Sequence, residues 1–407
     1  MHYNFDQIID RRGTNSVKWD EVRDPEMLPL WVADMDFATA PCVQEAIVRR
    51  AAHPCYGYVH VPDAYYQAIV DWFATRHQWE IEKEEILYTI GVIPAIGAIL
   101  KGLCQTGDNI VLLTPVYNHF YSLVREAGCQ AIEVELQSRP LGNGMLGFDI
   151  DFEQLEEALR QEKSTILLFC NPHNPAGRIW SEEEIRQVLA LCHKHHVTVI
   201  SDEIHNEITA PDRLYQPLAP VAAQYNQELA AQGDCPQPYI ICTSPSKSFN
   251  IAGLQNAFIV CPDRELRRRI DRAINLNEVC DVNPFGVEAL IAAYTEGGEW
   301  LNEMRTYVYR NYDFACQFLR QELPQFQIAD MQGTYLMWVN VSETLQQRQT
   351  TVEDLCRQLM IDQKVWFCPG SMYGKGGENY IRINLACPRA TLQEALLRLA
   401  AGIKQQG

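Results

Sequence analysis

Short apolar runs alternate with longer stretches of helical periodicity along most of the chain. The apolar runs occupy residues 84–90, 109–114, 164–170, 197–202, 239–244 and 254–261. Helical stretches lie between most of them. Residues 181–196 are an example, with a capping box at Ser181 and Glu184 and apolar residues recurring on one face. This alternation predicts buried strands connected by helices, and therefore an α/β fold built on a mostly parallel sheet.

The pattern changes after about residue 283. Long helical stretches are followed there by two runs, residues 334–341 and 380–386, that alternate as half-exposed strands do. We expect a second, smaller α+β domain in this region, and we expect the N-terminal segment to join it. The predicted division is a large domain of residues 48–284 and a small domain formed by residues 1–47 and 285–407.

Composition and charge exclude several classes of protein. The 407 residues are 47% hydrophobic, which is enough for a large core, and they carry a formal net charge of -18. The one basic run, residues 264–269, is short, so we expect no nucleic-acid partner. Residues 1–13 lack the regions of a signal peptide, and no apolar run approaches the ~20 residues that span a bilayer. We therefore expect no membrane association and a cytoplasmic location. The 14 cysteines are scattered singly without a CxxC pair, which favours reduced thiols.

Chemically selective residues follow the predicted strands, at the carboxyl ends where ligands collect in an open parallel sheet. The first strand leads through a glycine into a helix, so the backbone N–H groups of residues 91–93 can point at an anion such as phosphate. Later strands are followed by Tyr117, by the rigid loop "NPHNPAGRIW" of residues 171–180, by Asp202 and by Lys247.

These residue types match the requirements of pyridoxal phosphate. Its lysine forms a Schiff base, and its carboxylate keeps the pyridine nitrogen protonated so that the ring accepts electrons. Each residue also has a plainer interpretation. Lys247 can be a surface lysine and Asp202 a helix cap, while Tyr117 can be a core aromatic and Asn174 a turn residue. Their shared position at consecutive strand ends favours the cofactor site.

Several motifs carry a resemblance to a known family. "NPHNPAGRIW" (171–180) and "SPSKSFNIAGL" (244–254) are typical of the fold type, whereas "RRGTNSVKWD" (11–20), "LPLWVADMDFATAP" (28–41) and "VISDEIH" (199–205) indicate one group within it. The chain resembles the fold-type I, class-II aminotransferase-like pyridoxal phosphate enzymes, and among them the MalY/PatB type of cystathionine beta-lyase. The resemblance covers nearly the whole chain.

The resemblance implies roles for the cofactor-binding residues. Lys247 becomes the Schiff-base lysine and general base, and Asp202 the catalytic partner of the pyridine nitrogen. Asn174 hydrogen-bonds the phenolic oxygen of the ring, and Tyr117 stacks on its face and contacts the substrate. His205 joins the cofactor-binding residues, in a position where many aminotransferases have tyrosine. The phosphate is assigned to Gly91, Val92, Ile93, Ser244 and Ser246.

The resemblance also implies the substrate contacts and the assembly. Arg382 matches the arginine that binds the substrate α-carboxylate, although from the sequence alone it reads as a surface residue on a half-exposed strand. Tyr58 matches a tyrosine that reaches the neighbouring subunit's site, where it contacts the substrate and gives a proton to the leaving sulfur. A homodimer with shared active sites is therefore expected.

The reaction implied by the resemblance is cleavage of cystathionine, and of cysteine or related S-conjugates, to a thiol, pyruvate and ammonia. Two alternatives stay open at this point: an amino acid aminotransferase, and a lyase with an additional regulatory binding role. No metal is expected, because His193, His195 and His196 fall at the end of a predicted helix, where histidines complement the helix dipole.

Overall fold

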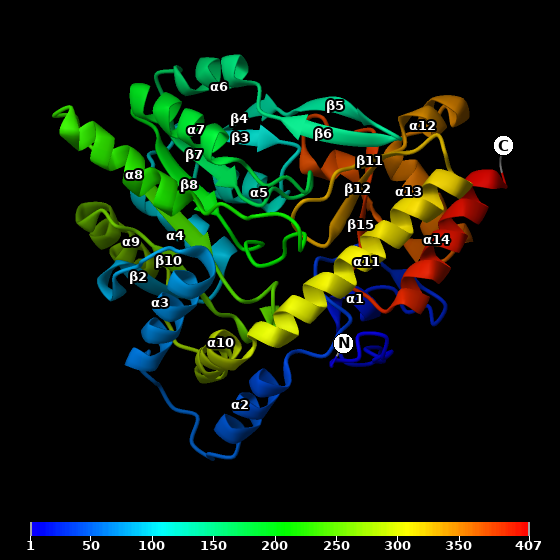
Figure 1. Ribbon diagram of the computed structural model, residues 1–407, viewed down its shortest axis with the longest axis horizontal. Helices are drawn as coiled ribbons and strands as arrows, with labels where there is room; N and C mark the ends of the chain where they lie inside the picture. Colours follow the sequence, from blue (N-terminus) through cyan, green and yellow to red (C-terminus); the bar gives the residue numbers. More distant parts are fainter. Residues whose placement is uncertain (1, 406–407) are drawn as a thin grey trace.

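A seven-stranded sheet forms the centre of the structure, a computed structural model that describes residues 2–405 (Figure 1). Its strands, in spatial order, are β2 (Ile86–Thr89), β10 (Ala257–Val260), β9 (Tyr239–Thr243), β8 (Thr198–Asp202), β7 (Ser164–Cys170), β3 (Asn109–Thr114) and β4 (Gln130–Glu135). The strands from β9 to β4 run parallel, and β10 is antiparallel to both of its neighbours. The mostly parallel α/β sheet is confirmed, and every predicted apolar run contains one of its strands. The pattern does not predict β4, because Val134 is its one buried residue.

Helices cover both faces of this sheet. On β3, Ile110 and Leu112 belong to the core that includes α4 (Val92–Leu103), α5 (His119–Glu126) and α9 (Arg264–Leu276). Val111 and Leu113 belong to the core that includes α3 (Asp63–His77), α6 (Phe152–Leu159), α7 (Glu182–Lys194) and α8 (Leu218–Ala231). Strands buried on both faces read as continuous apolar runs, which is why the sequence reveals them. The predicted capping box is present at the start of α7.

A six-stranded mixed sheet lies near the long helix α11 (Gly298–Glu322), which crosses the view of Figure 1 diagonally in yellow. Its strands, in spatial order, are β14 (Cys368–Pro369), β15 (Tyr380–Asn384), β12 (Leu336–Asn340), β11 (Gln327–Ala329), β6 (Met145–Asp149) and β5 (Gln137–Gly142). The helices of this part of the chain are α10 (Pro284–Glu296), α11, α12 (Ser342–Arg348), α13 (Val352–Asp362) and α14 (Arg389–Lys404). The hairpin of β5 and β6 comes from within residues 48–284, yet β6 pairs in parallel with β11. The division of the chain into two domains at residues 48 and 284 stays a prediction.

The N-terminal segment is attached by strand pairing and by buried charges. β1 (Leu28–Pro29) pairs in parallel with β13 (Val365–Trp366). In α1 (Val17–Asp20), Lys18 is buried, and its Nζ lies 2.8 Å from a carboxylate oxygen of Asp36. Arg11 forms ion pairs with Asp34 and Asp36 over 2.7 and 2.9 Å. These contacts hold residues 31–37 in place before the chain continues into α2 (Pro41–Ala51).

The expectation of half-exposed strands at residues 334–341 and 380–386 is wrong. β12 and β15 are buried along almost their whole length. The polar side chains of β15 face other segments of the protein rather than water. Asn384 donates hydrogen bonds to the carbonyls of Val32 and Asp34, and Arg382 donates one to the side chain of Asn174. The polar positions therefore form an internal interface, and Arg382 is 4% exposed rather than on the surface.

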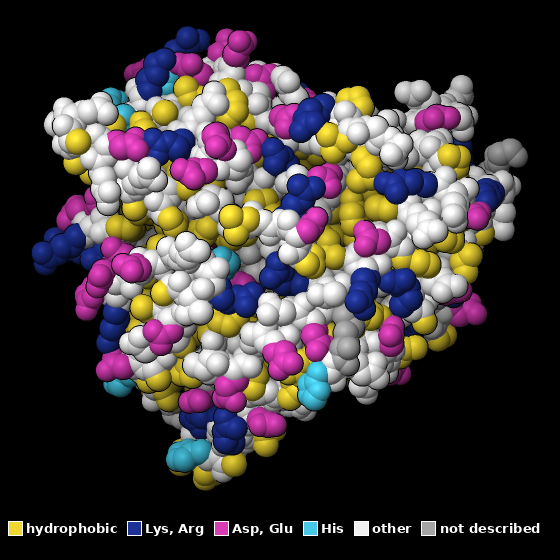
Figure 2. All heavy atoms as spheres, viewed as in Figure 1, with side chains coloured by type: hydrophobic (Ala, Val, Ile, Leu, Met, Phe, Trp, Pro, Cys, Tyr) yellow, Lys and Arg dark blue, Asp and Glu magenta, His cyan; other side chains and the backbone are white. Residues whose placement is uncertain are grey.

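The surface mixes charges of both signs, and Lys and Arg side chains alternate with Asp and Glu on the face shown in Figure 2. Among residues 2–405, no helix is both long and apolar enough to cross a bilayer. All 14 cysteines are free thiols, and most are buried, as the sequence pattern indicates.

Candidate active site

A cavity of about 190 Å³ opens at the carboxyl ends of the central strands. Residues that follow five different strands meet there, as expected for an open parallel sheet. Most of the cofactor-site residues predicted from the sequence line the cavity: Gly91, Val92, Ile93, Tyr117, Asn174, Asp202, His205, Ser246 and Lys247.

Lys247 follows β9 and projects into this cavity. Its Nζ donates a 2.6 Å hydrogen bond to the backbone carbonyl of Ala33, which also lines the cavity. Burial lowers the pKa of Lys247 to about 8, and the carboxylate of Asp34 opposes this effect. A fraction of the side chain is therefore the neutral amine near neutral pH, which is the form that attacks a carbonyl carbon.

Asp202 ends β8 and is 4% exposed. One of its oxygens accepts a 3.1 Å hydrogen bond from the backbone N–H of Ile204. Within residues 2–405, no cationic side chain lies close enough to form an ion pair with it. Burial raises the pKa of Asp202 to about 7, because a carboxylate without a cation is poorly stabilised inside a protein. A protonated ring nitrogen opposite Asp202 would supply the missing positive charge.

The start of α4 provides the anion-binding element. Gly91 precedes the helix without any side-chain cap, so the N–H groups of the first turn face the cavity without a capping partner. Ser246 lies on the cavity wall, as predicted. Ser244 does not line the cavity. It is 1% exposed, and its hydroxyl bonds to Ser246 and to the carbonyl of Asn256, so it supports Ser246 from behind.

The loop of residues 171–180 fixes Asn174. The backbone N–H of Asn171 donates to the carbonyl of Asp202 over 2.9 Å, and the ring Nε2 of His173 lies 3.0 Å from the carbonyl of Leu113. Both contacts join the loop to neighbouring strands of the central sheet. The stiffness predicted from its prolines therefore serves to hold one amide at the cavity.

Arg382 approaches Asn174 from the second sheet. One guanidinium nitrogen donates to Oδ1 of Asn174 over 3.1 Å and another to the carbonyl of Trp31 over 2.9 Å. The guanidinium also lies 4.8 Å from the ring centre of Tyr373. Its Nε atom is buried without a hydrogen-bond partner. A planar donor with an unused N–H suits a carboxylate ligand.

His205 lines the cavity and is 3% exposed. Burial lowers its pKa to about 3, with further lowering from the charges of Lys247 and Arg382. It is therefore a neutral imidazole at physiological pH, and its Nδ1 atom is buried without a partner.

The structure adds three residues that sequence reasoning did not select. Ala33 accepts hydrogen bonds from both Lys247 and the hydroxyl of Tyr335, the latter over 2.9 Å. Asp34 is the nearest carboxylate in the chain to these groups along the backbone, and its negative charge raises the pKa of both Lys247 and Tyr335. The one sequence signal for Ala33 and Asp34 is their place in the motif of residues 28–41. Tyr335 has no comparable signal, because it lies in an apolar strand.

Tyr58 lies outside the cavity of its own chain. Its side chain is fully exposed, at 100%, in the extended segment between α2 and α3. It does not touch the other predicted site residues within one chain.

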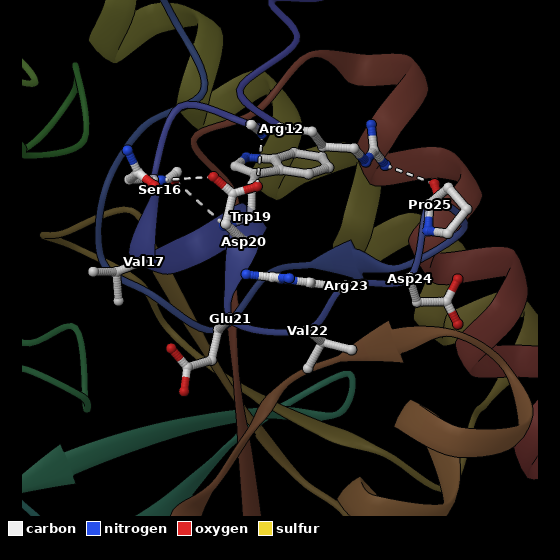
Figure 3. Close-up of a pocket in the computed structure, with 12 residues that line it drawn as sticks. Arg12, Ser16, Val17, Trp19, Asp20, Glu21, Val22, Arg23, Asp24 and Pro25 are labelled. Atoms are coloured by element: carbon white, nitrogen blue, oxygen red, sulfur yellow. Dashed lines mark hydrogen bonds between the residues drawn. The ribbon is translucent and has the colours of Figure 1, made fainter.

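A second pocket, of about 580 Å³, lies in the N-terminal segment (Figure 3). It is lined only by residues between Arg12 and Pro25. Asp20 accepts hydrogen bonds from the backbone N–H groups of Gly13 and Ser16, and Arg12 donates to the carbonyl of Pro25. These polar groups fold the segment onto itself, and none belongs to the predicted site. The smaller cavity at the sheet edge is therefore the candidate active site.

Comparison with known proteins supports this assignment. Residues 25–399 match the family model of aminotransferase class I and II. The chain is 35% identical to cystathionine beta-lyase PatB of Bacillus subtilis over 404 residues, which are 98% of this chain and 100% of that protein. A solved structure of a PLP-bound putative aminotransferase from Clostridium difficile matches with a TM-score of 0.91 and 36% identity, over 99% of this chain and 100% of that one. The PLP-bound C-S lyase from Staphylococcus hominis matches with a TM-score of 0.89 and 29% identity, over 98% and 99% of the two chains.

The residues of the cavity fit pyridoxal phosphate. The first turn of α4 and Ser246 can hold its phosphate, the unpaired carboxylate of Asp202 can face its ring nitrogen, and Lys247 can reach its carbonyl carbon. The chain therefore belongs to the aminotransferase class I and II family of pyridoxal phosphate enzymes, and within that family it is an enzyme of the carbon–sulfur lyase type.

Proposed function

We propose that this enzyme cleaves the bond between the β-carbon and sulfur of cystathionine. With one molecule of water, cystathionine would give homocysteine, pyruvate and ammonia, and cysteine would give sulfide in place of homocysteine. The observation that carries the proposal is the 35% identity to a cystathionine beta-lyase over nearly the full length of both chains. The cavity supports it, because it holds the lysine, carboxylate, amide and arginine that this chemistry uses.

The residues of this chain would divide the work as follows. Arg382 grips the α-carboxylate of the substrate and is itself fixed by Asn174 and Trp31. Lys247 takes the α-proton as general base, and its lowered pKa keeps a fraction of the amine neutral for this step. When bound, pyridoxal phosphate supplies the electron sink for the carbanion that results. Asp202 holds the positive charge of the ring nitrogen, and the thiolate leaves from the β-carbon.

The site also suits an aminotransferase, and the solved structure from Clostridium difficile is described as a putative one. Both reactions begin with removal of the α-proton. They differ in the next step, because an aminotransferase returns the proton to the cofactor and needs a keto acid to complete its cycle.

The deciding experiment measures pyruvate from cystathionine without any added keto acid, by coupling to lactate dehydrogenase and NADH. We expect steady pyruvate release from the purified enzyme and none from Lys247→Ala, which should also lose the yellow colour of the lysine-bound cofactor. Release that depends strictly on an added keto acid would contradict the lyase proposal and favour the aminotransferase.

We further propose that the active unit is a homodimer in which Tyr58 of each chain completes the site of the other. Its complete exposure in the single chain supports this, since a large aromatic side chain is seldom left fully in water. In the shared site, Tyr58 would contact the substrate and donate a proton to the leaving sulfur.

A further inference from the structure

Three side chains with metal-binding atoms meet on the surface at the end of α7. They are His193, in the last turn of α7, and Asp234 and Cys235, in the loop between α8 and β9. Their ligand atoms all lie within 4.8 Å of one another. The sequence pattern gives no hint of this group, because His193 is about 40 residues from the other two.

The carboxylate of Asp234 is held in a fixed orientation. One oxygen accepts a 2.8 Å hydrogen bond from the backbone N–H of Cys235, and the other lies 3.0 Å from Nε2 of His193. These two contacts lower the pKa of Asp234, so it is ionised at neutral pH. The ring of His193 also packs edge-on against Tyr225, with the ring centres 6.2 Å apart. The two harder ligands are therefore positioned before any ion arrives.

The combination of an imidazole, a carboxylate and a thiolate is a zinc-type donor set. Ligand atoms around a tetrahedral zinc stand about 3.3–3.8 Å apart, given bond lengths of ~2.0–2.3 Å. The separations in this group are close to that range, and the exposed side chains of Asp234 and Cys235 can close the rest. The C-terminal end of α7 adds the negative end of a helix dipole. We propose that His193, Asp234 and Cys235 bind one zinc ion, with water in the fourth position.

The neighbouring histidine does not belong to this site. Nε2 of His195 is 3.3 Å from a carboxylate oxygen of Glu156, on the other side of the helix end. His195 is thus a matched control on the same turn. Cys55, the other exposed cysteine, is a matched control for Cys235.

The zinc site lies at the opposite edge of the central sheet from the catalytic cavity. α7 ends just before β8 begins, and the loop of residues 232–238 ends just before β9 begins, whereas Asp202 and Lys247 follow the other ends of these strands. A bound ion would tie α7 to this loop without touching the catalytic residues. It should stabilise the fold and leave the lyase reaction unchanged.

The test uses untagged holoenzyme and zinc displaced from a chromophoric chelator. We expect one zinc ion per chain, with the affinity reduced at least about 10-fold in His193→Gln and in Cys235→Ser, since each removes a direct ligand. His195→Gln and Cys55→Ser should bind like the parent. Cobalt should give a thiolate charge-transfer band in the parent that Cys235→Ser lacks.

A second readout is thermal unfolding. Stoichiometric zinc should raise the Tm of the parent and of both control variants but not that of His193→Gln or Cys235→Ser. Equal zinc affinity in all variants, or no stoichiometric zinc in the parent, would overturn the proposal. Pyruvate release should be the same with and without zinc, and a loss of pyruvate release that follows the affinity of this site would contradict its separation from catalysis.

Discussion

The Nζ atom of Lys247 donates a hydrogen bond of 2.6 Å to the carbonyl of Ala33, 214 residues earlier in the chain. The next residue, Asp34, is held by an ion pair with Arg11 over 2.7 Å. Its Oδ1 atom is buried without a hydrogen bond and lies 3.5 Å from Nζ of Lys18. The N-terminal segment therefore sets the electrostatic surroundings of the catalytic lysine, although it lies far from that lysine in the sequence.

Replacing Asp34 should change how the apoprotein takes up pyridoxal phosphate as a function of pH. Uptake requires the neutral amine of Lys247, so its rate should rise with pH through about 8, the lowered pKa of this residue. The carboxylate of Asp34 raises that pKa by favouring the charged amine. In Asp34→Asn the midpoint should therefore move to lower pH, which stopped-flow absorbance can measure.

Asp10→Asn is the control for this variant, because Asp10 is exposed and belongs to the same segment. Its midpoint should equal that of the parent. An unchanged or higher midpoint in Asp34→Asn would mean that Asp34 does not stabilise the charged form of Lys247.

Arg382→Lys should weaken the grip on the substrate carboxylate. Lysine keeps the positive charge but loses the planar pair of donors, and two hydrogen bonds to a charged group are worth roughly 3 kcal/mol together. We expect kcat/KM for cystathionine to fall about 100-fold, mostly through KM. Arg125→Lys, at an exposed position of α5, should leave both constants unchanged. A normal KM in Arg382→Lys would remove Arg382 from the substrate site.

The sequence predicts most of the central sheet and most of the cavity lining for one physical reason. Strands buried on both faces need continuous apolar side chains, so polar residues at their ends stand out. Asp202 and Lys247 could be selected on this basis. The same reasoning fails at β15, where the polar side chains of Arg382 and Asn384 face internal partners and so resemble the exposed positions of a surface strand.

Contacts between distant segments are the part that sequence patterns do not reveal. The hydroxyl of Tyr335 reaches the carbonyl of Ala33 across 302 residues of chain, and neither residue has unusual chemistry of its own. Ala33 acts through a backbone oxygen, which every residue has. Its importance follows from the ion pairs that hold its neighbour Asp34, and these depend on the fold.

A buried charge cluster behind the active site should dominate the acid sensitivity of the fold. Glu207 is 2% exposed and accepts hydrogen bonds from Trp72 and Arg76 over 2.7 and 3.1 Å, while Nε2 of His77 lies 2.6 Å from it. All three partners are on α3. This cluster ties α3 to the loop that carries His205 into the cavity.

Glu207→Gln should lower the free energy of unfolding at pH 7 by on the order of 2–3 kcal/mol, because an amide cannot accept from both sides of this cluster. Nearby charges and hydrogen bonds, His77 first, lower the pKa of Glu207 to about 2, below its ordinary 4.5. The stabilisation is therefore complete above pH 4.5 and is lost as the pH falls toward 2. Urea unfolding should show the difference from the parent narrowing by about 1 kcal/mol between pH 7 and pH 3.5.

The exposed Glu126→Gln should unfold like the parent at both pH values. A constant difference between Glu207→Gln and the parent across this range would show that the Glu207 carboxylate is not stabilised in the folded protein.

The proposed sharing of sites between subunits predicts that two inactive variants can rescue each other. In a hybrid dimer of Tyr58→Phe and Lys247→Ala chains, one site combines the intact Lys247 of one chain with the intact Tyr58 of the other. The second site lacks both groups. Random pairing makes half of the dimers hybrid, each with one working site of two, so co-expressed chains should show about a quarter of the parent activity per site.

This result depends on Tyr58→Phe being strongly impaired by itself, which is measured first on the separate variant. Pairing Lys247→Ala with Asp202→Asn is the control, because both residues line the same cavity of one chain and no exchange of subunits brings an intact pair beyond what one chain holds. In that mixture each site of a hybrid dimer still lacks one essential group, so activity should equal the sum of the separate variants. Rescue by Tyr58→Phe above this level places Tyr58 in the partner's site. Activity that never exceeds the sum, with hybrid dimers confirmed by mass spectrometry of differently tagged chains, would show that each chain builds its site alone.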